Sequence, residues 1–181
     1  MRLRAVEREF GDQLRIRWRT FLLYPEEGER YMSAEVARAW QGAQEEEPEA
    51  PFARWPAGRA LPRSSLPAQE AAKAALRQGE DALWRLHPLL FKAYFARSAD
   101  ISDEETLLAL AAEAGLDVPR LRQDLASGEC ARETLEEHET AFERYGVSGV
   151  PTVIVDGGFP LLGALPLEMY RRAIERALAS G

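Results

Sequence analysis

The pattern of apolar and polar residues divides the chain into two ends with short strands and a helical middle. Residues 1–10 show helical spacing of apolar residues, and Gly11 ends that helix. Residues 14–19 alternate strictly between apolar residues and arginine, which predicts a strand at the edge of a sheet. The β-branched run at 152–155 predicts a short buried strand, and residues 159–162 predict a second one after a glycine turn.

Between these ends, apolar residues recur at helical spacing. Pro88 should kink or divide one of the helices. Ser102 and Glu105 form a capping box that opens another. Residues 41–65, rich in Glu, Pro, Ala and Gly, predict a long exposed loop. The expected helices cover residues 33–40, 66–78, 81–97, 103–115, 120–127 and 133–145, and a last one starts at Pro166.

Length and composition indicate one ordinary globular domain. The chain has 181 residues, 46% hydrophobic and 29% charged, which is enough to bury a core. No apolar stretch approaches the 18 residues of a membrane span, and no signal peptide opens the chain, so a cytoplasmic protein without a membrane partner is expected. A net charge of −7 argues against a nucleic-acid partner, since phosphates need a basic face.

The segment YGVSGVPTVIVDGGFPLLGALP resembles the C-terminal half of the DsbA-like branch of the thioredoxin superfamily. The segments SSLPAQEAAKAAL and GALPLEMYRRAIERAL extend the similarity to its FrnE-type members, so that it covers about residues 60–180 and also 1–25. The resemblance implies a single α/β domain over 1–181, a thioredoxin-like fold with a helical insertion. Residues 1–25 and 145–181 would form its core, and residues 60–144 the insertion.

The same resemblance gives a role to Val150 and Pro151. Proline cannot donate to a sheet ladder, so Pro151 suits the first residue of a strand, with a trans or a cis peptide bond before it. In the family this bond is cis, and the exposed backbone of the preceding residue pairs with an extended substrate. Val150 and Pro151 are therefore the expected substrate-binding residues, and protein or peptide thiols and disulfides the expected partners.

The Cys-x-x-Cys motif of the redox-active family members is absent from this sequence. Those members carry Cys-x-x-Cys at the start of the first helix, where the helix N-terminus lowers the thiol pKa. Residues 1–10 match the body of that helix, so either the protein starts further upstream or this is a redox-inactive member. The one cysteine, Cys130, cannot cycle as a dithiol and is expected to be a small semi-buried residue.

No catalytic residue, cofactor or metal site is therefore predicted. We expect His87 to be packed in an apolar helix and His138 to be solvated among glutamates, and neither has a second ligand at metal spacing.

Three functions stay open at this point. The first is thiol–disulfide exchange, inactive in this chain as given. The second is a glutathione-dependent isomerase or transferase of the 2-hydroxychromene-2-carboxylate isomerase or kappa-class type, with glutathione on the same loop. The third is a non-catalytic peptide-binding module. Because the first strand of the fold is not in the sequence, the strands at 14–20 and 151–156 should either pair directly or be covered by a second copy in a homodimer.

Overall fold

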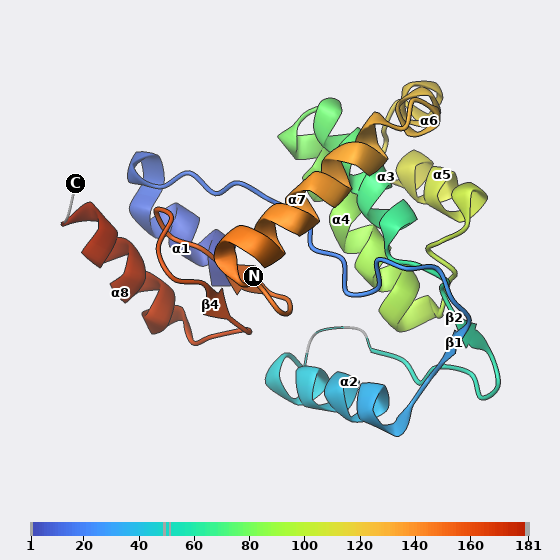
Figure 1. The fold of residues 1–181 in the computed structure, drawn as a ribbon, viewed down its shortest axis with the longest axis horizontal. Coiled ribbons are helices and arrows are strands. Elements are labelled where there is room, and N and C mark those ends of the chain that lie inside the picture. Colours follow the sequence, from blue (N-terminus) through green and yellow to red (C-terminus); the bar gives the residue numbers. More distant parts are fainter. Residues whose placement is uncertain (1, 49, 51, 180–181) are drawn as a thin grey trace. The chain divides into compact units, whose positions relative to one another are not determined.

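The computed structural model describes residues 2–48, 50 and 52–179 (Figure 1). These residues form two compact units. Unit 1 contains the described residues up to Leu23 and those from Glu136 onward, and unit 2 contains the described residues of Tyr24–Leu135. Helix α7 (Glu129–Tyr145) is shared by both units. The unit boundaries lie near the expected ends of the core, and the assignment of residues 1–181 to a single domain stays a prediction.

Unit 1 combines helices with a small sheet. Strands β3 and β4 pair antiparallel, with Thr152 opposite Leu162 and Val153 opposite Leu161. Helix α1 packs against helix α8 and buries Val6. The elements of unit 1 are α1 (Arg2–Phe10), the 3-10 turn η1 (Gly11–Gln13), the C-terminal part of α7, β3 (Thr152–Val153), β4 (Leu161–Leu162) and α8 (Leu167–Leu178).

The core of unit 1 lies between α1, α8 and the two strands. Val6, Tyr170 and Ile174 form its buried centre, and apolar side chains of both strands pack against them. The Tyr170 hydroxyl donates a hydrogen bond to the Gly163 oxygen and accepts one from the Leu165 N–H, both at 3.2 Å. A buried tyrosine whose hydroxyl is satisfied in this way joins the helix to the loop before it.

Three of the predicted elements of unit 1 are confirmed in position. The helix over 1–10 is α1, and the runs at 152–155 and 159–162 contain β3 and β4. The strand at 152–155 was predicted to be buried. It is half-buried and only two residues long, because β4 is its one partner among the described strands.

The predicted strand over 14–19 is wrong. The side chains alternate as expected, with Leu14, Ile16 and Trp18 partly buried and the arginines between them exposed. No described strand pairs with this segment, so direct pairing with β3, one of the two alternatives left open by the sequence, is absent. The alternation of apolar and polar residues indicates which side chains of the segment are buried. A strand also needs a neighbouring strand whose backbone pairs with its N–H and C=O groups.

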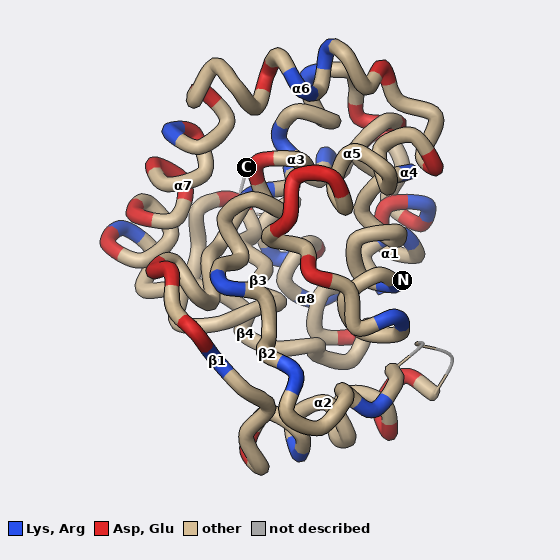
Figure 2. Tube along the Cα trace, turned by 90° about the vertical axis from the view of Figure 1, so that its right-hand side faces the viewer, with Lys and Arg blue, Asp and Glu red and all other residues tan. Residues whose placement is uncertain are grey.

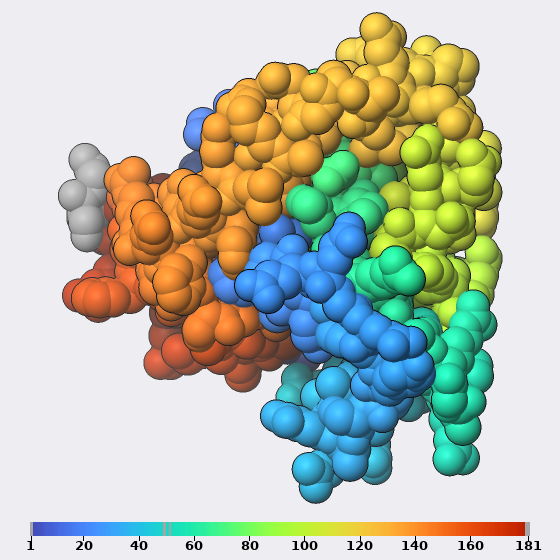
Figure 3. Space-filling view, turned by 45° about the vertical axis from the view of Figure 1, so that its right-hand side comes forward, coloured from blue at the N-terminus to red at the C-terminus, as the bar shows by residue number. Residues whose placement is uncertain are grey.

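Unit 2 is mainly helical, with one short antiparallel pair. Helix α3 contacts α4, α5 and α6, and α5 packs on α6, as Figures 1 and 3 show. The alanines of α3 are almost completely buried, and such small side chains allow neighbouring helices to approach closely. The elements of unit 2 are β1 (Arg30–Tyr31), α2 (Ala34–Glu46), β2 (Ala60–Leu61), α3 (Leu66–Arg77), α4 (Glu80–Phe91), the π-helical turn η2 (Lys92–Ala96), α5 (Glu104–Glu113), α6 (Val118–Ala126) and the start of α7.

The long exposed loop predicted over 41–65 is wrong at both ends and in its middle. Helix α2 extends to Glu46, and residues 60–61 pair with β1. In the middle, Trp55 is only 5% exposed, and its indole N–H donates to the Arg59 oxygen at 3.1 Å. The composition suggested solvent exposure, but one large aromatic side chain anchors the segment.

One further detail of unit 2 differs from prediction, and a second is settled in part. The cap of α5 is Asp103, one residue after Ser102; its carboxylate accepts hydrogen bonds from the N–H and hydroxyl of Thr106 at 2.9 and 2.8 Å. A carboxylate is the stronger acceptor at a helix N-terminus. Pro88 lies inside α4 without dividing it, so of the two predicted effects division is wrong, and α4 gives way to the π-helical turn η2 four residues later.

His87 is packed as predicted, between Trp84 and Phe91, at ring-centroid distances of 5.9 and 5.0 Å. Burial lowers the pKa of His87 below its ordinary 6.5. The folded state therefore favours the neutral ring, and its stability falls as the pH drops below 6.5 and through the lowered pKa. We expect His87→Leu to lose less stability than the wild type between pH 7.5 and pH 5, measured by denaturant unfolding. An equal loss in both proteins would contradict this.

Candidate substrate-binding loop

The candidate site is the loop of residues 146–151, which joins α7 to β3. Gly146 ends the helix with a φ of +63°, a backbone conformation that favours glycine. Its N–H donates to the Phe142 oxygen at 3.1 Å, and the N–H of the buried Val147 donates to the Ala141 oxygen at 2.9 Å. The start of the loop is therefore fixed to the last turns of α7.

The other end of the loop is fixed to the strand pair. The Thr152 hydroxyl donates to the Gly149 oxygen at 2.7 Å, and the Pro151 oxygen accepts from the Gly163 N–H at 2.8 Å. The peptide bond between Val150 and Pro151 is cis, as expected. Both neighbours of Val150 are thus held by hydrogen bonds, Gly149 by the Thr152 side chain and Pro151 by the backbone of Gly163.

Val150 itself is exposed to solvent, and its backbone is unpaired within the described residues. The residue is 49% exposed, and in the part of the chain that the structure describes its backbone N–H and C=O have no hydrogen-bond partner. Leu162, across the strand pair from Thr152, is 51% exposed, and its Cδ1 would lie 3.6 Å from a Cβ on Gly149. The loop therefore presents a free backbone edge beside an exposed apolar side chain, and the sequence pattern gave no sign of the contribution of Leu162.

Cys130 is fully buried in the first turn of α7, deeper than the semi-buried position predicted. Burial raises the pKa of its thiol to about 11, against the opposing effect of the Arg77 guanidinium. Arg77 is itself engaged by Asp124 and Glu133, at 3.3 and 2.6 Å. A thiol of this pKa carries very little thiolate at neutral pH, so Cys130 is not a nucleophile.

The prediction that His138 is solvated is wrong. Its Nδ1 accepts a hydrogen bond from the Leu22 N–H at 3.2 Å, and its ring packs on Phe21 at 4.8 Å between centroids. Charged residues recur along α7 (Figure 2), and this pattern predicted a solvated histidine. Among the described residues, no group of three or more His, Cys, Asp or Glu side chains is placed to hold a metal ion.

Glu137, the neighbour of that histidine, was missed as an anchor. Its Oε2 accepts from the backbone N–H and the hydroxyl of the buried Thr20 at 2.8 and 2.9 Å, and its Oε1 accepts from Arg19 at 2.9 Å. Together with His138 it attaches the end of the extended segment to α7. Glu137 is one of several glutamates in this helix, and nothing in the sequence distinguishes it from the others.

The arrangement of α1, the β3–β4 pair and α8, with a helical insertion before a cis-proline loop, defines an α/β protein of the thioredoxin-like class. The chain belongs to the family of DSBA-like thioredoxin domains, whose family model matches residues 1–175. This confirms the resemblance and the fold class expected from the sequence, and it places the chain in a family of the thiol–disulfide oxidoreductase type.

A solved structure supports the fold over the whole chain. The crystal structure described as "a putative protein disulfide isomerase from Nitrosomonas europaea" superposes with a TM-score of 0.82. The likeness covers 99% of this chain and 89% of that chain at 17% sequence identity, a level that shows the fold alone. In addition, no helix in the described part of the chain is both long and apolar enough to cross a membrane.

Proposed function

We propose that this chain binds extended protein or peptide segments that carry thiols or disulfides along Val150 and Pro151, and that its 181 residues perform no dithiol exchange by themselves. The observation that carries the binding proposal is the free, exposed backbone of Val150, held between two fixed neighbours. An extended peptide can pair with such an edge through main-chain hydrogen bonds, and a neighbouring apolar side chain adds contact area.

The absence of exchange follows from the single cysteine. Intramolecular dithiol cycling needs two thiols, one of them an accessible thiolate. Cys130 is alone in the sequence, has no exposed surface and has a raised pKa. The cytoplasmic location expected from the sequence stays a prediction.

A backbone variant tests the binding proposal. The probe is a fluorescein-labelled insulin B chain with carboxymethylated cysteines, so that only non-covalent binding is measured, by fluorescence anisotropy. Val150→Pro removes the N–H that would pair with the peptide, and we expect its Kd to rise about three- to tenfold, because one hydrogen bond contributes about 0.5–1.5 kcal/mol. Val150→Ala keeps this N–H and should bind more tightly than Val150→Pro.

The comparison holds if all three proteins show the same thermal unfolding transition. Equal affinity of Val150→Pro and wild type, or no saturable binding of the wild type, would refute the role of this backbone edge. Displacement of the labelled B chain by added glutathione would instead support the glutathione-binding alternative.

A further inference from the structure

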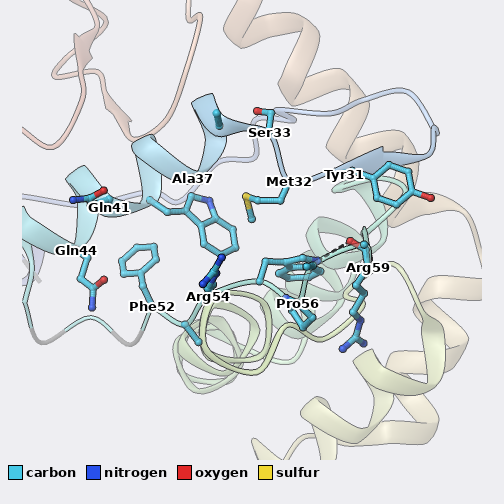
Figure 4. A pocket seen from close by; sticks show the side chains of 16 residues that line it. Tyr31, Met32, Ser33, Ala37, Gln41, Gln44, Phe52, Arg54, Pro56 and Arg59 are labelled. Carbon is cyan, nitrogen blue, oxygen red and sulfur yellow. Dashed lines mark hydrogen bonds between the residues drawn. The ribbon is translucent and has the colours of Figure 1, made fainter.

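Unit 2 contains a cavity that has no part in the proposed peptide site. Its volume is about 680 Å³, and its lining comes from residues 31–33, from α2 as far as Gln44 and from residues 52–59. Figure 4 shows Met32 and Phe52 directed into the space between α2 and that segment. A volume of this size lies within the usual range for small-molecule sites, about 300–1,000 Å³.

The wall of the cavity is aromatic. Trp40 of α2 meets Trp55 at 6.1 Å and Phe52 at 6.0 Å, and behind them it meets Tyr94 and Phe95 at 5.3 and 4.8 Å between ring centroids. Most of these pairs are edge-to-face, the arrangement that aromatic rings prefer. Such a wall offers flat apolar surface to a ring-shaped ligand.

Helix α2 depends on this cluster for its position. None of its 13 residues is buried, and it makes no close backbone contact with another helix or strand of the described chain. Its attachment is the side chain of Trp40, packed on the rings opposite. The face of α2 that lines the cavity is therefore left open for a ligand to cover.

The charged side chains that line the cavity are both cations. Arg54 and Arg59 both line it, with the amides of Gln41 and Gln44 on α2, and no described lining residue is acidic. Neither guanidinium has a carboxylate partner within the described chain, although acidic residues outnumber basic ones by 30 to 23. Arg59 lies over the Trp55 ring, 6.0 Å from its centroid.

We propose that this cavity is a binding site for small aromatic carboxylic acids. The apolar ring would stack on the partly exposed Trp40 and Phe52, which the buried Trp55 supports, and the carboxylate would be held by Arg54 or Arg59. A guanidinium binds a carboxylate through two parallel hydrogen bonds, which a neutral isostere does not allow.

The test uses the purified chain and isothermal titration calorimetry with naphthalene-2-carboxylate. Naphthalene-2-carboxamide is the matched neutral probe. We expect saturable binding of the acid, weaker binding of the amide, and an affinity for the acid reduced at least about tenfold in the double variant Arg54→Gln/Arg59→Gln. Arg38→Gln is the control, because Arg38 is an exposed arginine of α2 outside the cavity, and its removal should leave the affinity unchanged.

Three outcomes would overturn the proposal: no saturable binding of the acid, equal binding of acid and amide, or an equal loss in Arg38→Gln, which would indicate a general charge effect. A further arm compares Ala-Ala-Phe with a free and with an amidated C-terminus. Binding of the free peptide without binding of naphthalene-2-carboxylate would assign the cavity to peptide C-termini and would equally overturn the small-molecule proposal. Near-ultraviolet circular dichroism of each variant checks that the aromatic cluster is intact.

Discussion

The purified 181-residue chain is expected to catalyse the reduction of insulin no faster than dithiothreitol alone. Two thiols are required for a disulfide to pass from substrate to enzyme and on to the reductant, and the sequence contains only Cys130. With a pKa of about 11, its thiolate fraction at pH 7 is on the order of 10⁻⁴. The turbidity of precipitating insulin B chain, followed over time, measures the rate.

Cys130→Ala is the matched variant for this assay and should give the same background rate. Reaction with a thiol reagent provides a second readout. We expect the folded chain to label with DTNB orders of magnitude more slowly than the chain in guanidinium chloride, since Cys130 has no exposed surface. An insulin rate well above background that survives Cys130→Ala would show that the chemistry lies elsewhere in the chain.

The same chain is expected to form a homodimer through the extended segment at 14–19. The backbone groups of Arg15, Ile16 and Arg17 have no hydrogen-bond partner among the described residues, and β3 also has a free edge. An unpaired, alternating segment of this kind is a template for a strand from another molecule. A second copy of the segment would supply the missing ladder.

Light scattering coupled to size-exclusion chromatography measures the molar mass of the chain in solution, at several protein concentrations in the micromolar range. Arg17→Pro removes one backbone N–H from the edge while changing an exposed side chain, and we expect it to shift the population toward monomer. Arg17→Ala keeps the N–H and is the control for loss of charge. A monomer that unfolds cooperatively at every concentration would show that the segment needs no partner strand, and the dimer prediction would be wrong.

Local interactions made much of this fold predictable. Each helix satisfies its backbone over four residues, so apolar spacing and the glycines at 11, 79, 115, 128 and 146 located most helices within a few residues. The cis-proline loop is encoded in a contiguous stretch of sequence, and the peptide bond between Val150 and Pro151 is cis as that stretch predicts. Their role in substrate binding is a proposal that the loop geometry supports.

Distant contacts decided the rest. Residues 14–19 have the alternation of a strand, but whether a strand forms depends on a partner that local sequence does not specify. The inertness of Cys130 arises from burial among α3, α6 and α7, and the position of His138 from a hydrogen bond to Leu22, 116 residues away. The cavity of unit 2 likewise exists because Trp40 and Trp55, on either side of a polar stretch, meet Tyr94 and Phe95. Spacing along the chain encodes which side chains share a helix face, whereas packing between segments far apart determines which groups are buried, paired or left open.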